Sequence, residues 1–218
     1  AIQGCTEMTK FTTAQVEVDM GDGTSVHFVF DGNGKVVREN GHFLNPVPNA
    51  FSLVQIEDCP QATATCKLSC YVHRLEIAEP SVHNAYRWNS QWMRWGMERE
   101  DRAIRIEEVF ARWIAVNCLG GFRWHISGDI FSARYAQFIA AVCMRVDKIP
   151  FWIYTRSCAF LDELVGPQNL IVNLSADVDN YFDAIEMAQR YRLRICYMTV
   201  AGEVPYLPVG SVIFPSHE

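Results

Sequence analysis

The 218-residue sequence has no apolar run that approaches the roughly 18 residues of a membrane-spanning helix. Its first residues, AIQGCTEMTKFTTAQ, have no basic segment followed by an apolar core, so we expect no signal peptide. There is no internal repeat and no low-complexity segment. Basic residues are not in excess, and a net charge of −6 gives no general reason to bind nucleic acid or an anionic membrane. These absences predict a cytoplasmic protein with no membrane partner.

What is present is typical of a globular protein. Hydrophobic residues make up 50% of the chain and charged residues 20%. The length fits one α/β domain, because such domains run to about 200–250 residues. The chain has eight cysteines, and thiols stay reduced in the cytosol. Cysteines in that compartment indicate metal binding, redox chemistry or plain buried thiols.

The N-terminal part has a β pattern. Residues 14–38 alternate polar and apolar side chains around two glycine-rich turns, at 21–23 and 31–34, which predicts a three-stranded antiparallel meander. The next segment, ENGHFLNPVPN, is linker-like because it is rich in Gly, Asn and Pro. We therefore expect residues 1–50 to form a meander and linker packed on a main domain of residues 51–218.

From residue 51 the pattern alternates strand and helix, which indicates βαβ units and a parallel sheet. The predicted fold is α/β, as a partial (β/α) barrel or an open doubly wound sheet, preceded by the antiparallel meander. The expected strands are FSLVQIE (51–57), FRWHIS (122–127), FWIYT (151–155), NLIVNLS (169–175), LRICYMT (193–199) and SVIF (211–214). The expected helices are 81–95, 101–117, 132–146, 157–166 and 181–191.

Polar residues follow several of these strands. In parallel α/β folds the ligand site forms beyond the carboxyl ends of the strands, so we expect the polar residues to converge there. Asp129 and Asp177 are candidates to accept hydrogen bonds from a ribose or an amine, and Arg156 to grip a carboxylate or phosphate. Ser127 completes this predicted ligand-binding set, and His125 should face the same side of its strand. The alternative is that these side chains cap helices or pair with neighbouring charges.

Three cysteines, Cys59, Cys66 and Cys70, lie in one polar loop after the first expected strand of the main domain. A structural zinc needs four ligands, and His73 could complete a set of three cysteines and one histidine. An iron–sulfur cluster is also held by cysteine thiolates, and three cysteines leave one iron open. Cys158, which follows a later strand, is equally well explained as a fourth metal ligand or as a packed thiol. The other four are expected to be buried thiols: Cys5, Cys118, Cys143 and Cys196.

The three-cysteine loop resembles that of the radical S-adenosylmethionine superfamily, in which three cysteines hold a [4Fe–4S] cluster and the cofactor binds the fourth iron. The usual spacing there is C-x3-C-x2-C. Cys66 and Cys70 match the first interval, but His73 occupies the third position and Cys59 lies upstream. The resemblance implies a [4Fe–4S] cluster and, if it extends to activity, S-adenosylmethionine.

A closer resemblance is to a bacteriophage family, the gene product eighty-eight proteins, over roughly residues 52–216. It implies a phage origin, hence the cytosol of an infected bacterium, and a cluster more strongly than an activity. The matching motifs are Cys59-Pro60, Cys66, Cys70-Tyr71, Ser127-Gly128-Asp129, Pro150, Trp152, Tyr154-Thr155-Arg156-Ser157 and Ser175-Ala176-Asp177.

A further pattern concerns nucleic acid. Trp88, Trp92 and Trp95 recur at helical spacing with arginines close by, a combination that can stack on unpaired bases. The same spacing also makes one apolar helix face, and core packing is the stronger interpretation. The sequence thus predicts a phage iron–sulfur protein, as a radical S-adenosylmethionine-type enzyme acting on a small molecule. The alternative is a non-catalytic redox-sensing or regulatory protein that binds a host protein or nucleic acid.

Overall fold

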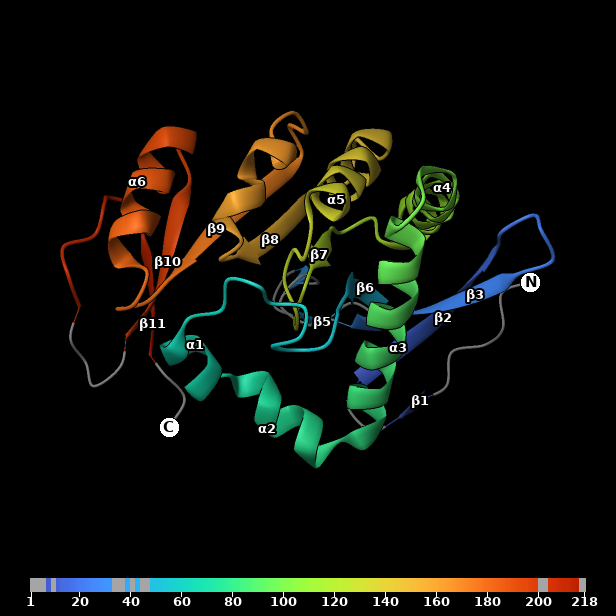
Figure 1. Cartoon of the computed structure of the whole chain (residues 1–218), viewed down its shortest axis with the longest axis horizontal. Coiled ribbons are helices and arrows are strands. Elements are labelled where there is room, and N and C mark those ends of the chain that lie inside the picture. The colour runs from blue at the N-terminus through green and yellow to red at the C-terminus, as the bar shows by residue number, and fades with distance from the viewer. Residues whose placement is uncertain are drawn as a thin grey trace.

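The computed structural model describes residues 7–8, 11–32, 38–39, 42–43, 48–199 and 204–215. Its main feature is one sheet with nine strands, in the order β1-β2-β3-β6-β7-β8-β9-β10-β11 (Figure 1). These strands are β1 (Glu7–Met8), β2 (Phe11–Asp19), β3 (Ser25–Gly32), β6 (Pro48–Phe51), β7 (Phe122–Trp124), β8 (Phe151–Thr155), β9 (Leu170–Ala176), β10 (Arg194–Thr199) and β11 (Val212–Pro215). A separate pair is formed by β4 (Arg38–Glu39) and β5 (His42–Phe43).

The direction of pairing changes once along the sheet. From β1 to β6 the neighbours are antiparallel, and from β6 to β11 they are parallel. The sheet is open, with β1 and β11 at its two edges among the described strands. The mixed α/β class is therefore confirmed, with antiparallel strands first and parallel strands after, and the sheet does not close into a barrel.

Helices lie on both sides of the sheet. Figure 1 shows α4, α5 and α6 along one side, while α1 and α2 run along the other side and lead into α3. The helices are α1 (Ala64–Leu68), α2 (Tyr71–Ala78), α3 (Pro80–Met97), α4 (Glu100–Asn117), α5 (Ala133–Arg145), α6 (Tyr181–Tyr191) and the 3-10 helix η1 (Cys158–Leu164). None of the helices in these ranges is both long enough and apolar enough to cross a bilayer.

Aromatic side chains dominate the core. The Phe110 ring on α4 lies edge-on to Phe28 and Phe51, with centroids 5.1 Å away in both cases. It also packs edge-on against Phe138 of α5, at 5.4 Å. Edge-to-face pairs at such distances are favourable beyond their buried area. Because Phe28 belongs to the antiparallel half and Phe51 begins the parallel half, one core serves both halves of the sheet.

Several predicted elements are confirmed. The strand at 151–155 and the helix at 181–191 have the expected bounds. The helix expected from 132 is α5, and the Ser132 hydroxyl caps it by accepting a hydrogen bond from the backbone N–H of Tyr135. The β2–β3 hairpin is also confirmed. The third meander strand was expected at residues 35–37, which lie outside the described residues.

Two expectations were wrong. The FSLVQIE segment is not a strand beyond Phe51, because its backbone groups find partners outside a ladder: Leu53 N–H donates to Ser127 O, and Val54 N–H donates to Ser90 Oγ. The helix expected at 81–95 does not end there, since α3 runs from Pro80 to Met97. A side chain at Gly96 would meet Ile106 of α4 at 2.4 Å, so this glycine allows the two helices to approach closely.

Candidate metal and ligand site

A pocket of about 190 Å³ lies at the carboxyl ends of the parallel strands. Its position follows from topology, because β6, β7 and β8 are parallel neighbours and their following loops emerge at the same edge. Six of the predicted site residues belong to its wall: Cys59, Cys66, Cys70, Ser127, Asp129 and Arg156. Residues from three separate stretches of sequence, 59–70, 127–129 and 156, are thus brought together as expected.

The three loop cysteines all face this pocket and are all partly buried. Cys59 lies in the loop after β6, Cys66 lies within α1, and Cys70 is the residue before α2. Burial raises the pKa of the Cys59 thiol well above its usual range, and the nearby charge of Asp129 adds to this. Burial also raises the pKa of Cys66, although the Arg156 guanidinium opposes the shift. Without a bound cation the Cys59 and Cys66 thiols are neutral, so they are poor nucleophiles.

The loop that carries the cysteines is held by Asp177. The Thr63 hydroxyl donates to Asp177 Oδ2 at 2.6 Å and accepts the backbone N–H of Cys66 at 2.9 Å, so it caps α1. Arg156 Nη2 lies 3.1 Å from the same carboxylate oxygen, whose side chain is fully buried. Asp177 therefore lies behind the pocket as an anchor, and Arg156 is held beside Cys66.

Asp129 is equally committed to protein partners. Its carboxylate accepts hydrogen bonds from Thr155 Oγ1 at 2.6 Å, from Arg156 N–H at 2.9 Å and from Ile130 N–H at 2.8 Å. Burial raises the pKa of Asp129, and these three donors oppose the shift. The carboxylate thus ties the loop after β7 to the end of β8. These contacts favour a structural role for Asp129 over ribose binding.

Gly128 sets the path of this loop. Its φ is +79°, which favours glycine, and a Cβ there would lie 2.6 Å from Leu53 Cβ. The neighbouring Ser127 hydroxyl lies 3.5 Å from Glu76 Oε1 of α2, a long contact. Gly128 therefore allows the loops after β6 and β7 to approach each other closely.

His125 does not sit on a regular strand as expected. β7 ends at Trp124 and His125 has a φ of +62°, so strand alternation does not set its direction. His125 nevertheless lines the same pocket as Ser127, as expected. Its Nε2 lies 2.8 Å from the Tyr135 hydroxyl, while Nδ1 is buried with no hydrogen-bond partner. Burial lowers the pKa of His125 to about 3, so the imidazole is neutral.

The pocket also contains four residues that the sequence analysis gave no binding role, although Tyr154 and Ser175 belong to the motifs shared with the phage family. Arg123, Tyr154, Ser175 and Met198 all line it, from strands β7 to β10. The Arg123 guanidinium lies over the Tyr154 ring, 5.1 Å from its centroid. The period-2 alternation of β7 and β8 could have found these two, since both are half-buried between fully buried neighbours.

Two predicted ligands lie elsewhere. Cys158 opens η1 and is packed partly against the core, and it is not in the pocket wall. His73 is exposed, with Nδ1 2.8 Å from Gln55 Nε2. In the part of the chain that the structure describes, no three His, Cys, Asp or Glu side chains lie close enough together to hold a metal ion as they stand.

The family model and the similar curated proteins indicate the same phage family. The family model described as Gene product 88 matches residues 27–208. The "Gene 88 protein" of Mycobacterium phage D29 is 29% identical over 180 residues, covering 79% of this chain and 71% of the relative. The "Gene 88 protein" of Mycobacterium phage L5 is 29% identical over the same shares of each chain. No solved structure matches.

Proposed function

The chain belongs to the Gene product 88 family, a phage family, and we propose that it binds a [4Fe–4S] cluster through Cys59, Cys66 and Cys70. The observation that supports this proposal is that all three thiols line one pocket, although ten residues lie between the first and the last along the chain. The pocket lies where parallel α/β proteins place their ligands. The proposed place of action is the host bacterial cytosol.

The residues present fit the proposed group. Cysteines bind metal as thiolates, so a bound cation would have to offset the burial that raises the pKa of Cys59 and Cys66. A single zinc ion binds sulfur at about 2.3 Å, which requires its ligands to converge on one point. The described side chains do not converge in this way. A four-iron cluster offers a separate iron to each thiol, so three cysteines spread around a pocket suit it better than they suit zinc.

The leading function is a radical S-adenosylmethionine-type enzyme. Among the described cysteines only Cys59, Cys66 and Cys70 line the pocket, which leaves one iron without a thiol from the protein. When bound, such a cluster supplies an electron to a small molecule held at that iron. In this proposal the parallel half of the sheet acts as a partial (β/α) barrel. Ser127 and Arg156 in the pocket wall would bind the small molecule. Asp177 and Asp129 would keep the surrounding loops in position through their hydrogen bonds.

A second candidate is a non-catalytic redox-sensing or regulatory protein. The pocket of about 190 Å³ is smaller than the roughly 300–1,000 Å³ of most small-molecule sites. The Asp129 and Asp177 carboxylates are already bonded within the protein, so they are not available to a ribose. Both observations favour a cluster with no room for a nucleoside-sized cofactor.

The test is anaerobic purification followed by iron, sulfide and zinc assays on the parent and two variants. Cys66→Ala removes a proposed ligand, and Cys143→Ala removes a buried thiol of α5 that lies outside the pocket. We expect iron and sulfide in equal amounts in the parent and in Cys143→Ala, and their loss in Cys66→Ala. Zinc without sulfide, or equal iron in all three proteins, would contradict the proposal.

Adding S-adenosylmethionine to the reduced protein separates the two candidate functions. An open iron that binds the cofactor changes the electron paramagnetic resonance spectrum of the cluster. An unchanged spectrum, in a sample with full iron content, favours the sensing or regulatory role.

A further inference from the structure

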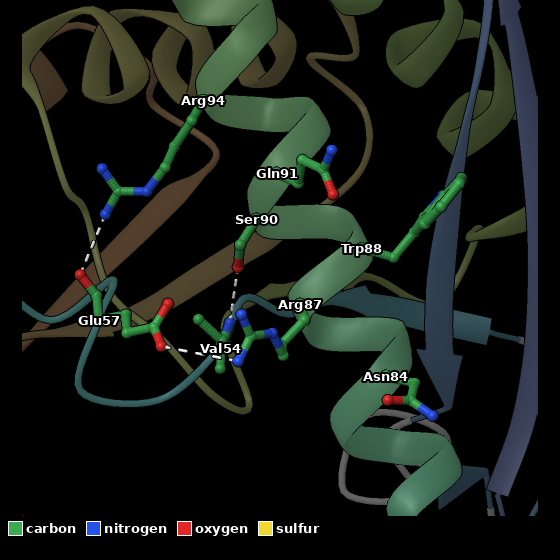
Figure 2. Close-up of a pocket in the computed structure, with 8 residues that line it drawn as sticks. All are labelled: Val54, Glu57, Asn84, Arg87, Trp88, Ser90, Gln91 and Arg94. Atoms are coloured by element: carbon green, nitrogen blue, oxygen red, sulfur yellow. Dashed lines mark hydrogen bonds and ion pairs between the residues drawn. The ribbon is translucent and has the colours of Figure 1, made fainter.

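A second, larger groove lies along α3. None of the residues that line it also lines the cysteine pocket. Its volume is about 540 Å³, within the range of small-molecule sites. Figure 2 shows Arg87, Ser90 and Arg94 on the side of α3 that faces Val54 and Glu57, with Asn84, Trp88 and Gln91 along the adjoining side. We call these eight residues the α3 groove.

Arg87 offers a cation to this groove. Its Nη1 lies 3.9 Å from Glu57 Oε1, and the two side chains are 58% and 64% exposed. An ion pair this long and this exposed contributes little, about 0–1 kcal/mol. Breaking this pair to bind a phosphate would therefore cost little. The freed guanidinium can bind two phosphate oxygens in a planar two-point contact.

Arg94 has a different role, since it is fixed by the buried Asp58. Its Nε donates to Asp58 Oδ1 at 2.6 Å, and its Nη2 donates to the backbone oxygen of Glu57 at 3.0 Å. The Asp58 side chain is fully buried. Arg94 therefore holds the loop that forms one wall of the groove, and its charge is largely balanced.

Trp88 supplies an aromatic surface. Its side chain keeps 44% exposure, and Nε1 donates to the backbone oxygen of His27 at 2.8 Å, which fixes the ring. Trp92 packs edge-on against it at 5.8 Å. A held, half-exposed indole is a surface on which a base can stack.

Two amides complete the groove. Asn84 and Gln91 flank Trp88 on the helix, and their side chains form no hydrogen bond within the part of the chain that the structure describes. Carboxamide groups present a donor and an acceptor side by side, the arrangement that pairs with the edge of a nucleobase. The groove thus joins three groups that recognise different parts of one molecule.

We propose that the α3 groove binds a nucleotide, with its phosphate on Arg87, its base against Trp88 and the base edge at Gln91 or Asn84. An acidic peptide would use Arg87 alone and leave the indole and the amides without a role. The same chemistry is offered by a free mononucleotide and by a nucleotide unit of an unpaired strand. This site does not depend on a cluster.

The test is titration calorimetry of the purified full chain with adenosine monophosphate, inorganic phosphate and an unpaired ten-nucleotide strand. We expect saturable binding of the nucleotide and much weaker binding of phosphate alone. Arg87→Gln should weaken nucleotide binding on the order of tenfold or more, because it removes a charged hydrogen bond. Arg112→Gln, at an exposed position of α4 outside the groove, makes the same charge change and should bind like the parent.

The two sources of ligand are distinguished by the strand. Binding of the strand no tighter than the monophosphate indicates a free nucleotide, and tighter binding indicates an unpaired strand. Absence of saturable binding by either probe, or equal weakening in Arg87→Gln and Arg112→Gln, would overturn the proposal. Cys66→Ala should bind the nucleotide like the parent, so loss of the cluster and loss of this site are separate outcomes.

Discussion

Asp31 is a carboxyl group buried where β3 pairs with β6. Its Oδ2 accepts a hydrogen bond from Ser52 Oγ at 2.6 Å, and its partner across the ladder is Ala50. Burial raises the pKa of Asp31 from 3.8 to about 7, against the opposing hydrogen bond from Ser52. One side chain can therefore link the stability of the fold to pH near neutrality.

The sign of this effect follows from proton binding. Between pH 4 and 7 the folded protein keeps the proton on Asp31 while the unfolded chain loses it, so the free energy of unfolding falls as pH rises. The contribution is up to about 1.4 kcal/mol per pH unit. Asp31→Asn should gain stability over the parent as pH rises from 4 to 7, measured by urea unfolding at several pH values. Asp147→Asn, at an exposed position, is the control. Parallel curves for Asp31→Asn and the parent would contradict this prediction.

At the scale of elements, the cysteine loop is positioned by contacts with distant strands. Thr63 caps α1 and reaches Asp177 at the end of β9, and the backbone N–H of Thr65 donates to Asp179 at 2.8 Å. The helix it caps is only five residues long. So short a helix is not stable alone, and these tertiary contacts determine where Cys66 lies.

Replacing Thr63 tests this dependence. Thr63→Val keeps the shape of the side chain but removes both the cap and the bond to Asp177, and should cost about 1–2 kcal/mol. Thr63→Ser keeps the hydroxyl and should stay close to the parent. The free energy of unfolding from urea titration measures both variants, and an equal loss in the two would show that the hydroxyl is not what matters.

At the scale of the whole molecule, the two halves of the sheet share one core. β3 pairs with β6, and Phe110 of α4 contacts rings from both halves. The expected boundary near residue 50 thus lies inside a continuous sheet. Folding of the antiparallel strands should depend on the parallel half.

Phe110→Ala should therefore destabilise the entire chain. Truncating a buried Phe costs about 3–5 kcal/mol. Unfolding of the parent and the variant, followed by tryptophan fluorescence and by circular dichroism, should give coincident single transitions. A variant in which only one of the two signals shifts would indicate that the halves unfold separately.

Local chemistry made much of this architecture predictable. Ser132 and the apolar spacing after it are sufficient to place α5, and alternating apolar residues are sufficient to place β8. The same logic failed at FSLVQIE, because a buried apolar run reads as a strand even when side chains and loops satisfy its backbone. It also failed in the strand expected at 122–127, which ends at Trp124 because the positive φ of His125 interrupts the strand.

The sequence by itself determined the α/β class, the grouping of three cysteines and their place at the carboxyl ends of the strands, since these depend on patterns of neighbouring residues. Only the tertiary structure decided which polar side chains remain available to bind a ligand. It paired Asp129 with Thr155 and Asp177 with Thr63, put Cys158 outside the pocket, and brought Arg123 and Tyr154 into it. The reason is physical: a buried polar group takes the partner nearest in space, and distance along the chain does not specify that partner.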